Sequence, residues 1–255
     1  MRLTFLGTGT SQGVPVIGCE CEVCKSTDPK DKRLRTSAMV ETEENTFVID
    51  TGPDFRQQML RNTPTDMPKV LFTHEHKDHI AGLDDIRAFN FKYRKPIEIY
   101  ASLSVQKALK REFYYVFEEQ KYPGVPEVKL NTISGDESFT INGTEIVPIN
   151  LLHHKMPVLG FRIGNIAYIT DTNYLPPEEE HKLEGLEILI LNALRKEKHY
   201  SHFNLEEAIE LVQKLKSKKA YFTHISHLMG KHADVEKELP HHMHLAYDGL
   251  VAELD

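Results

Sequence analysis

The stretch Leu71–Gly82, LFTHEHKDHIAG, places three histidines and an aspartate within six positions, from His74 to His79. The preceding apolar residues predict a buried strand over 69–74 that ends at His74. Alternate side chains of an extended segment share a face, so His74 and His76 point the same way. Asp78 and His79 follow where the chain turns into a helix. Four ligands from so short a stretch cannot all reach one ion without strain, so the segment predicts two neighbouring metal ions.

Further candidate ligands lie at the ends of other apolar runs. Asp171 ends the run in YITD, and His224 ends YFTH, which repeats the pattern of LFTH. The stretch LLHHKMPVLG offers His154, with its neighbour His153 as the alternative. In α/β architectures, sites are built at the carboxyl ends of the strands. Imidazole and carboxylate ligands suit Zn, Mn or Fe rather than Ca or a soft-metal site.

The composition is that of an ordinary globular protein. The chain has 255 residues, of which 40% are apolar and 27% charged, and a formal net charge of −7. This charge provides no global basic field for nucleic acid, and no apolar run approaches the roughly 20 residues that a membrane span needs. The first residues, MRLTFLGTGTSQG, lack the long apolar stretch of a signal peptide. These features favour a cytoplasmic location.

Apolar periodicity predicts many short strands with helices between them. Asn142-Gly143 and Gly164-Asn165 lie between β-rich runs and predict two hairpins. The predicted strand segments are residues 1–7, 37–42, 45–50, 69–74, 97–102, 137–150, 159–171, 186–193, 219–226 and 244–254. The predicted helices are residues 54–62, 82–93, 103–117 and 204–218. No stretch has the composition of a linker.

Taken together, these residues resemble the metallo-β-lactamase superfamily. THEHKDH matches its H-x-H-x-D-H signature, VIDTGPD precedes it, and a histidine, an aspartate and a histidine follow in order. The resemblance covers essentially the whole chain. It implies one domain over residues 1–255 with an α/β fold, a four-layer αβ/βα sandwich that holds metals at one edge of two packed sheets. Carried over by position, it implies His74, His76 and His154 for the first metal, Asp78, His79 and His224 for the second, and Asp171 as the bridge between them.

Two of these positions indicate a branch of the superfamily. Flavodiiron-type oxygen reductases have a carboxylate at the position of His76, and many true β-lactamases have a cysteine at that of Asp171. The Gly-Leu pair in HIAGLDD is similar to the phosphodiesterase branch, which includes tRNase Z. Asp50, in VIDTGPD, is expected to orient a metal-binding histidine without contacting the metal itself.

Three cysteines, Cys19, Cys21 and Cys24, lie close together in GCECEVCKS. An odd number so tightly spaced cannot form a disulfide framework, and in a reducing cytosol such clusters more often bind metal. The spacing suits one tetrahedral zinc that lacks a fourth ligand; unliganded, reduced thiols are the alternative. His227, in THISH, is the candidate for the fourth position. The competing histidines are His232, His241, His242 and His244.

The cysteine motif, the preceding FLGTGTSQGVP and the late THISH closely resemble the PhnP family of cyclic phosphodiesterases. In that family these four positions hold a structural zinc. The resemblance also implies that His202, in HYSHFNLEEA, is an additional active-site histidine that protonates the leaving group. His199 is the alternative, and capping of the next helix by Ser201 or Asn204 is the structural alternative. PqqB, an enzyme family of cofactor biosynthesis, is similar in its cysteine motif.

These features predict a metal-dependent phosphodiesterase for a small diester, cyclic diesters included, that uses a hydroxide bridging two metal ions. Asp78 is assigned a catalytic role with His202, because its charge and that of Asp171 leave the ion pair only weakly positive. The predicted cofactors are two divalent ions, Zn or Mn with Ni or Fe as alternatives, and one structural zinc.

Two other functions stay open, a tRNase Z-like nuclease and a PqqB-like oxidative enzyme. The nuclease would need a long basic arm, which neither FKYRKP nor KREFYY supplies. The expected partner is therefore a small phosphodiester. Nucleic acid is disfavoured, no membrane partner is expected, and a homodimer stays open.

Overall fold

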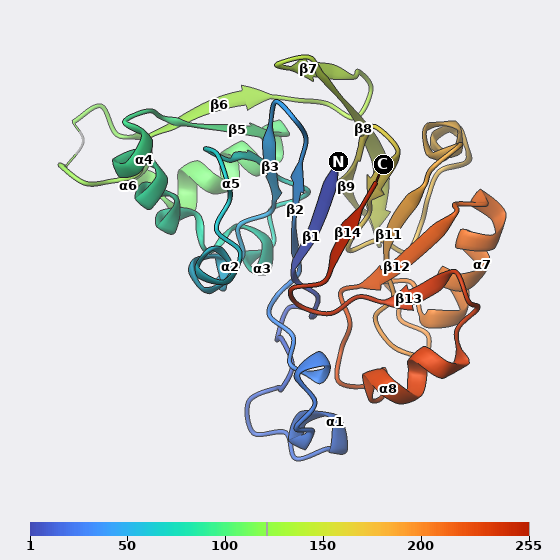
Figure 1. Ribbon diagram of the computed structural model, residues 1–255. Coiled ribbons are helices and arrows are strands. Elements are labelled where there is room, and N and C mark those ends of the chain that lie inside the picture. The colour runs from blue at the N-terminus through green and yellow to red at the C-terminus, as the bar shows by residue number, and fades with distance from the viewer. Residues whose placement is uncertain (121, 255) are drawn as a thin grey trace.

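The computed structural model describes residues 1–120 and 122–254. Within these residues, two seven-stranded sheets pack face to face, and helices cover the outer face of each (Figure 1). The first sheet has the order β14-β1-β2-β3-β4-β5-β6, and the second has the order β13-β12-β11-β10-β9-β8-β7. The predicted four-layer αβ/βα sandwich is confirmed.

The bounds of the elements are as follows. The first sheet contains β1 (Arg2–Gly7), β2 (Ser37–Glu41), β3 (Thr46–Ile49), β4 (Lys69–Leu71), β5 (Ile97–Ala101), β6 (Val128–Thr132) and β14 (Val251–Glu253). The second contains β7 (Phe139–Ile141), β8 (Thr144–His153), β9 (Met156–Ile163), β10 (Ile166–Tyr168), β11 (Ile188–Asn192), β12 (Lys219–Thr223) and β13 (Met243–Leu245). The α-helices are α1 (Glu22–Lys25), α2 (Phe55–Arg61), α3 (Lys77–Ile80), α4 (Arg87–Tyr93), α5 (Leu103–Glu112), α6 (Tyr114–Phe117), α7 (Leu205–Leu215) and α8 (His232–Val235).

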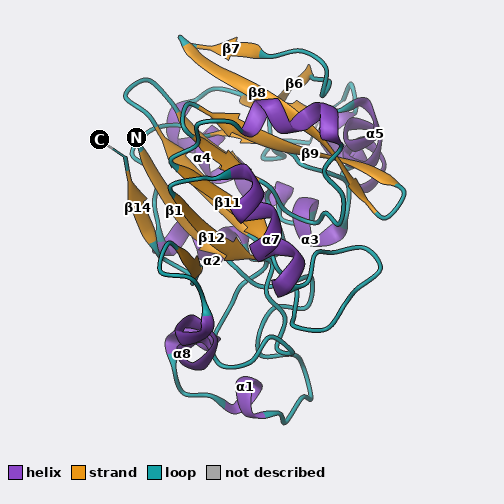
Figure 2. Cartoon of the chain, turned by 90° about the vertical axis from the view of Figure 1, so that its right-hand side faces the viewer, coloured by secondary structure: helices purple, strands orange, loops and turns teal. Residues whose placement is uncertain are grey.

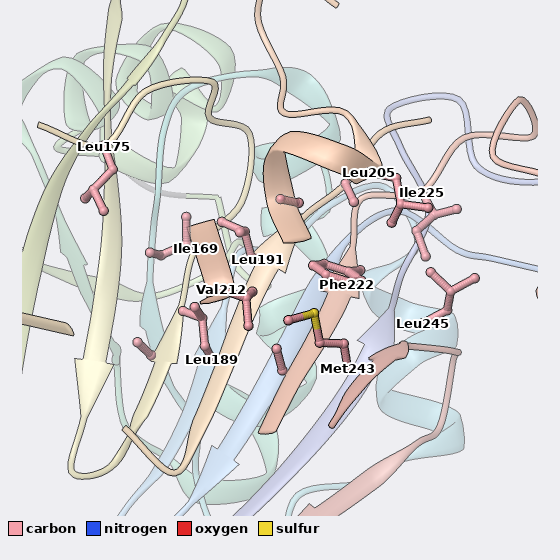
Figure 3. Close-up of a cluster of buried hydrophobic side chains, with 14 of the residues drawn as sticks. Ile169, Leu175, Leu189, Leu191, Leu205, Val212, Phe222, Ile225, Met243 and Leu245 are labelled. Atoms are coloured by element: carbon pink, nitrogen blue, oxygen red, sulfur yellow. The ribbon is translucent and has the colours of Figure 1, made fainter. Parts of the chain in front are cut away.

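Three buried clusters hold the layers together, and the alternation of side chains along each strand produces them. In β3, Phe47 and Ile49 face the second sheet, whereas Val48 packs with the helices that cover the first. In β11, Ile190 belongs to the cluster between the two sheets. Leu189 lies on the other face, in the cluster that includes Val212 of α7 (Figure 3). Because both faces of these strands are buried, their sequences are continuously apolar rather than alternating.

The candidate ligands gather at one edge because parallel strands end there. β3, β4 and β5 are parallel neighbours, as are β10, β11 and β12. Long loops gather below these strand ends (Figure 2). Asp50, Asp171 and His224 each follow a strand and have φ values of 64°, 53° and 57°. This left-handed conformation costs a non-glycine residue about 1–3 kcal/mol.

The predicted strand over 69–74 and the predicted helix over 103–117 have different ends in the structure. The strand predicted over 69–74 ends at Leu71, so His74 lies beyond it in the loop that leads to α3. The helix predicted over 103–117 is divided into α5 and α6, because Phe113 between them has non-helical angles of φ −120° and ψ 43°. Apolar periodicity alone did not reveal this interruption.

The predicted strand over 244–254 is divided as well. Its two parts are the end of β13 and all of β14, which belong to different sheets, and a turn at Gly249 with φ 86° separates them. The strand β6 was not predicted. Its side chains are half-buried or exposed, so its sequence does not have the apolar pattern of a buried strand. Among the described residues 1–120 and 122–254, no helix combines the length and the apolarity that crossing a membrane requires.

Candidate metal centre

The segment after β4 delivers its side chains to the sheet edge in two ways. His74 is fully buried and lies in the extended part, where its ring is 4.7 Å from that of His76. His76 occupies the N-cap position of α3, so Asp78 and His79 lie in the first turn of that helix. The change from loop to helix thus splits the motif into two pairs of ligands, as the spacing predicted.

Asp171 lies between the two pairs. Its carboxylate oxygens are 3.8 Å from His74 Nε2, 3.4 Å from His79 Nε2 and 2.8 Å from His224 Nδ1. Among the groups of ligand atoms that share it, two contain the residues of the HEHKDH segment, and each is compact enough for one ion. One group is His74, His76 and Asp171, and the other is Asp78, His79, Asp171 and His224.

The structure brings His153 rather than His154 to this site. The His153 ring is 5.2 Å from that of His76, and its ligand atom groups with those of Asp171 and His202. His154 is exposed, has φ 57°, and its ring is 5.8 Å from Tyr200 on the surface. The assignment of His154 to the first metal does not fit this geometry, because β8 ends at His153 and the chain turns away at the next residue.

The inward nitrogen atoms of three rings have no hydrogen-bond partner. His74 Nε2, His79 Nε2 and His224 Nδ1 are buried and unpaired, although each lies close to a carboxylate oxygen. Buried polar atoms are rarely left in this state unless an ion or a water satisfies them. The donor set of imidazoles and carboxylates fits divalent Zn, Mn or Fe. The residues present therefore fit a pair of divalent ions.

Neighbouring groups hold the outward nitrogen atoms of three candidate ligands, His79, His153 and His224. His79 Nδ1 donates to Asp50 Oδ2 at 2.7 Å, and His153 Nδ1 donates to the carbonyl oxygen of Ser201 at 2.8 Å. His224 Nε2 lies 3.2 Å from Thr10 Oγ1. Such contacts fix the orientation of each ring and leave the other nitrogen to face the ion. Asp50 therefore occupies the orienting position expected of it.

Thr10 is a site residue that the sequence analysis missed. It lies after β1 in the loop GTGTSQG, and this glycine-rich turn at a strand end was the available signal. The backbone approaches closely here: a Cβ atom at Gly9 would lie 3.0 Å from the Arg33 side chain and its carbonyl oxygen. A larger residue at Gly9 would therefore push against the backbone of residues 33 and 34 beside Thr10.

Burial and charge set the protonation of the rings in the metal-free chain. Burial holds the pKa of His74 well below its usual range and also lowers that of His153. Burial would lower the pKa of His79 too, but the carboxylates of Asp171, Asp78 and Asp50 raise it well above the usual range. A cation at this position would replace that proton, because metal binding requires neutral imidazole.

His202 lies next to the ligand groups, just before α7. It is 8% exposed, and its ring is 4.9 Å from that of His224 and 4.6 Å from that of His153. The alternative, His199, is more exposed; its ring lies 5.1 Å from that of His202, and its Nδ1 lies 3.3 Å from Ser201 Oγ. Asn204 caps α7 with a capping box, so the helix does not need His202 for this purpose.

The cysteine group forms a second candidate site at the same end of the molecule. The Sγ atoms of Cys19, Cys21 and Cys24 lie 3.3, 3.4 and 3.6 Å from His227 Nδ1. Hydrogen bonding, first from the Cys24 backbone N–H, lowers the pKa of Cys21 to about 6, whereas burial raises that of Cys24 to about 11. The four side chains form the set of a tetrahedral zinc site.

The competing histidines have other contacts. His232 Nδ1 lies 3.3 Å from Arg33, and His244 Nδ1 lies 2.7 Å from Glu236. His241 and His242 pack against each other with ring centroids 5.3 Å apart. Only His227, among the histidines of the described residues, belongs to the cysteine group.

A cleft of about 1020 Å³ lies at the opposite end of the strands and contains none of these ligands. Turns between strands line it, including Asn142-Gly143 and Gly164-Asn165. These turns precede β8 and β10, whereas His153 and Asp171 lie at or beyond the far ends of the same strands. The candidate metal ligands therefore lie at the carboxyl ends of these strands, as in other α/β architectures.

Comparisons with known proteins agree with this geometry. A family model described as β-lactamase superfamily domain matches residues 45–225. A crystal structure described as a new diphosphatase from the PhnP family is 39% identical, with a TM-score of 0.92 over 99% of this chain and 97% of that chain. Zinc-bound PqqB from Methylobacterium extorquens shares the fold, with a TM-score of 0.78 and 20% identity over the full length of both chains.

A further relative is much longer. An octanoyltransferase from Porphyromonas gingivalis is 38% identical over 257 residues, which are 100% of this chain but 52% of that protein. The chain spans about half the length of the curated relatives it matches. The match to the family model and the full-length match to the diphosphatase lead to one conclusion: the chain belongs to the β-lactamase superfamily and, within it, to the PhnP family of metallo-hydrolases.

Proposed function

We propose that the chain is a metal-dependent phosphodiesterase for small phosphodiesters, cyclic diesters included. The observation that carries this proposal is the position of Asp171, which two compact groups of ligand atoms share. When bound, two divalent ions activate water at neutral pH and neutralise the charge of phosphate oxygens. Asp78 and Asp171 reduce the net charge of such an ion pair, so that a monoanionic diester binds and its product can leave.

The cysteine group has a separate role in this proposal. One zinc held by Cys19, Cys21, Cys24 and His227 would join the N-terminal loop to the segment that carries His224, three residues before His227. The loop also contains Thr10, which contacts the His224 ring. A structural zinc here would therefore hold two parts of the candidate active site in register.

His202 is proposed to protonate the leaving group. Burial lowers the pKa of His202 to about 3, so its ring is neutral at pH 7 in the free chain. A bound phosphodiester anion favours the protonated ring, because opposite charges at short distance stabilise each other. The acid role therefore belongs to the substrate complex, and in the free chain His202 offers one N–H donor and one acceptor.

A second candidate substrate is a diphosphate, because the relative that is 39% identical is described as a diphosphatase. The two substrates differ in their need for His202. A phosphate leaving group is far less basic than an alkoxide and gains little from protonation. The relative rates of the His202→Ala variant on diphosphates and on alkyl diesters would therefore separate them.

The test combines elemental analysis with a substrate panel. Protein expressed with added Zn or Mn, and purified without chelator, should carry up to three metal ions per chain. It should hydrolyse bis(p-nitrophenyl) phosphate, cyclic nucleotides or a diphosphate ester, and Asp78→Ala should abolish this activity. Absence of metal after supplemented expression, or a panel in which no phosphate ester is cleaved at any metal loading, would overturn the proposal.

The two alternatives are further outcomes of this test. Cleavage of a precursor tRNA with no activity on small diesters would favour the nuclease. Oxygen consumption that depends on bound iron would favour the oxidative enzyme. An octanoyl ester belongs in the panel because of the long relative from Porphyromonas gingivalis.

A further inference from the structure

A series of four rings leads from the metal centre to the protein surface. The rings of His224 and His202 are 4.9 Å apart with an angle of 22° between their planes. His202 and His199 follow at 5.1 Å and 36°, and His199 and Tyr200 at 4.6 Å and 30°. The first pair is stacked and the next two are tilted, so the rings are in successive contact from a candidate metal ligand to the last ring, Tyr200.

Tyr200 ends the series with most of its surface free. Tyr200 is 74% exposed, so a large and mostly apolar ring faces solvent. The His199 ring lies against it, and the His154 ring meets it at 86° and 5.8 Å. The rest of the tyrosine ring is open to a further flat group.

The backbone around Tyr200 is tied to the metal centre. The carbonyl oxygen of the next residue, Ser201, accepts a hydrogen bond from the candidate ligand His153 at 2.8 Å. Asn173 Nδ2 donates to the carbonyl oxygen of Tyr200 at 3.3 Å, and Asn173 Oδ1 accepts from the N–H of His154 at 2.7 Å. Hydrogen bonds therefore tie the backbone that carries the Tyr200 ring to the segments of the metal centre.

We propose that Tyr200 is a stacking platform for a nucleobase, and that the substrate of the metal centre is a nucleotide derivative. This inference rests on the proposed phosphodiesterase function and names its substrate class. The phosphate would lie at the metal centre and the base on Tyr200. His202, the proposed acid, lies between the metal centre and Tyr200. The base on Tyr200 would therefore belong to the group that leaves with the oxygen that His202 protonates. Base stacking on an aromatic side chain is sequence-tolerant, so the platform accepts more than one base.

The test measures binding rather than turnover. Adenosine 5′-monophosphate and ribose 5-phosphate carry the same phosphate and sugar, and only the first has a base. Isothermal titration calorimetry with metal-loaded protein should show that the nucleotide binds about 5- to 150-fold more tightly, the range expected for one stacked base. Tyr200→Leu should reduce this ratio to about one, with the affinity for ribose 5-phosphate unchanged. Tyr200→Phe should keep the ratio, because the ring remains.

Tyr114, a 62% exposed tyrosine on α6, provides the matched control. Tyr114→Leu should leave both affinities unchanged. The proposal is overturned if the wild-type protein does not prefer the nucleotide, if neither phosphate binds, or if the preference survives in Tyr200→Leu. It is also overturned if Tyr200→Leu weakens both ligands equally, because the residue would then only support the loop. A nucleotide preference without hydrolysis of any diester would instead overturn the proposed function alone.

Discussion

Asp50→Asn should weaken metal binding without removing any atom that could contact the ion. The carboxylate of Asp50 is fully buried and accepts three hydrogen bonds: His79 Nδ1 at 2.7 Å, the Thr73 N–H at 2.9 Å and the Thr73 hydroxyl at 2.8 Å. Asparagine has one acceptor oxygen and an NH₂ group in place of the second. At least one of these donors would therefore face another donor.

The size of the effect follows from the role of the contact. Removal of a partner that orients a metal-binding histidine typically reduces metal affinity about 10- to 100-fold, which corresponds to about 1.4–2.7 kcal/mol. The loss of charge acts in the same direction, because a neutral partner makes His79 a weaker base. We therefore expect the dissociation constant of the ion held by His79 to rise by this factor.

The assay is competition with a chelating dye at equilibrium, followed by elemental analysis of the protein. Asp248→Asn is the matched control, because Asp248 also accepts three hydrogen bonds, two from Thr8 and one from the N–H of Leu34. Asp248 contacts none of the candidate ligands, so its variant should lose stability while it retains metal affinity. Metal affinity of Asp50→Asn within twofold of the wild type, or an equal loss in both variants, would refute the orienting role.

Three further predictions concern the two candidate sites. His153→Ala should reduce bound metal and hydrolysis at least tenfold, whereas His154→Ala should change either by less than about twofold; the reverse result would restore His154 as the ligand. Cys21→Ser should lower the Tm by about 5–10 °C, or about 2–3 kcal/mol, with little change in turnover per folded molecule; lost turnover at unchanged Tm would make the cysteine site catalytic. His202→Ala should slow hydrolysis of alkyl diesters about 10²–10⁴-fold and nitrophenyl diesters far less, with metal content unchanged; equal losses on both would make His202 a phosphate contact instead.

The sequence predicted the fold because the relevant signals are local. Strands with both faces buried are continuously apolar, and the segment after β4 contains four ligands in order. The sequence does not show at which residue a strand ends, and this decides which of two adjacent side chains faces the site. His153 and His154 are chemically identical, and only the end of β8 decides which one faces the ions.

Contacts between distant segments were the other limit. Thr10 and His224 are 214 residues apart in the chain and meet only because β1 and β12 end at the same edge. The fourth position of the cysteine group had five candidate histidines in the sequence. Packing of the loop that contains the cysteines against the segment after β12 selects His227.

The left-handed backbone at Asp50, Asp171 and His224 has a consequence for the robustness of the protein. Glycine adopts such angles without penalty, so each of these side chains is retained at a cost of about 1–3 kcal/mol in folding free energy. Glycine at these positions would relieve the strain, but at Asp50 it would also leave the Thr73 N–H and hydroxyl without their acceptor. The strained angles at the three strand ends therefore serve the chemistry of the site, and stabilising changes compatible with function have to be sought away from them.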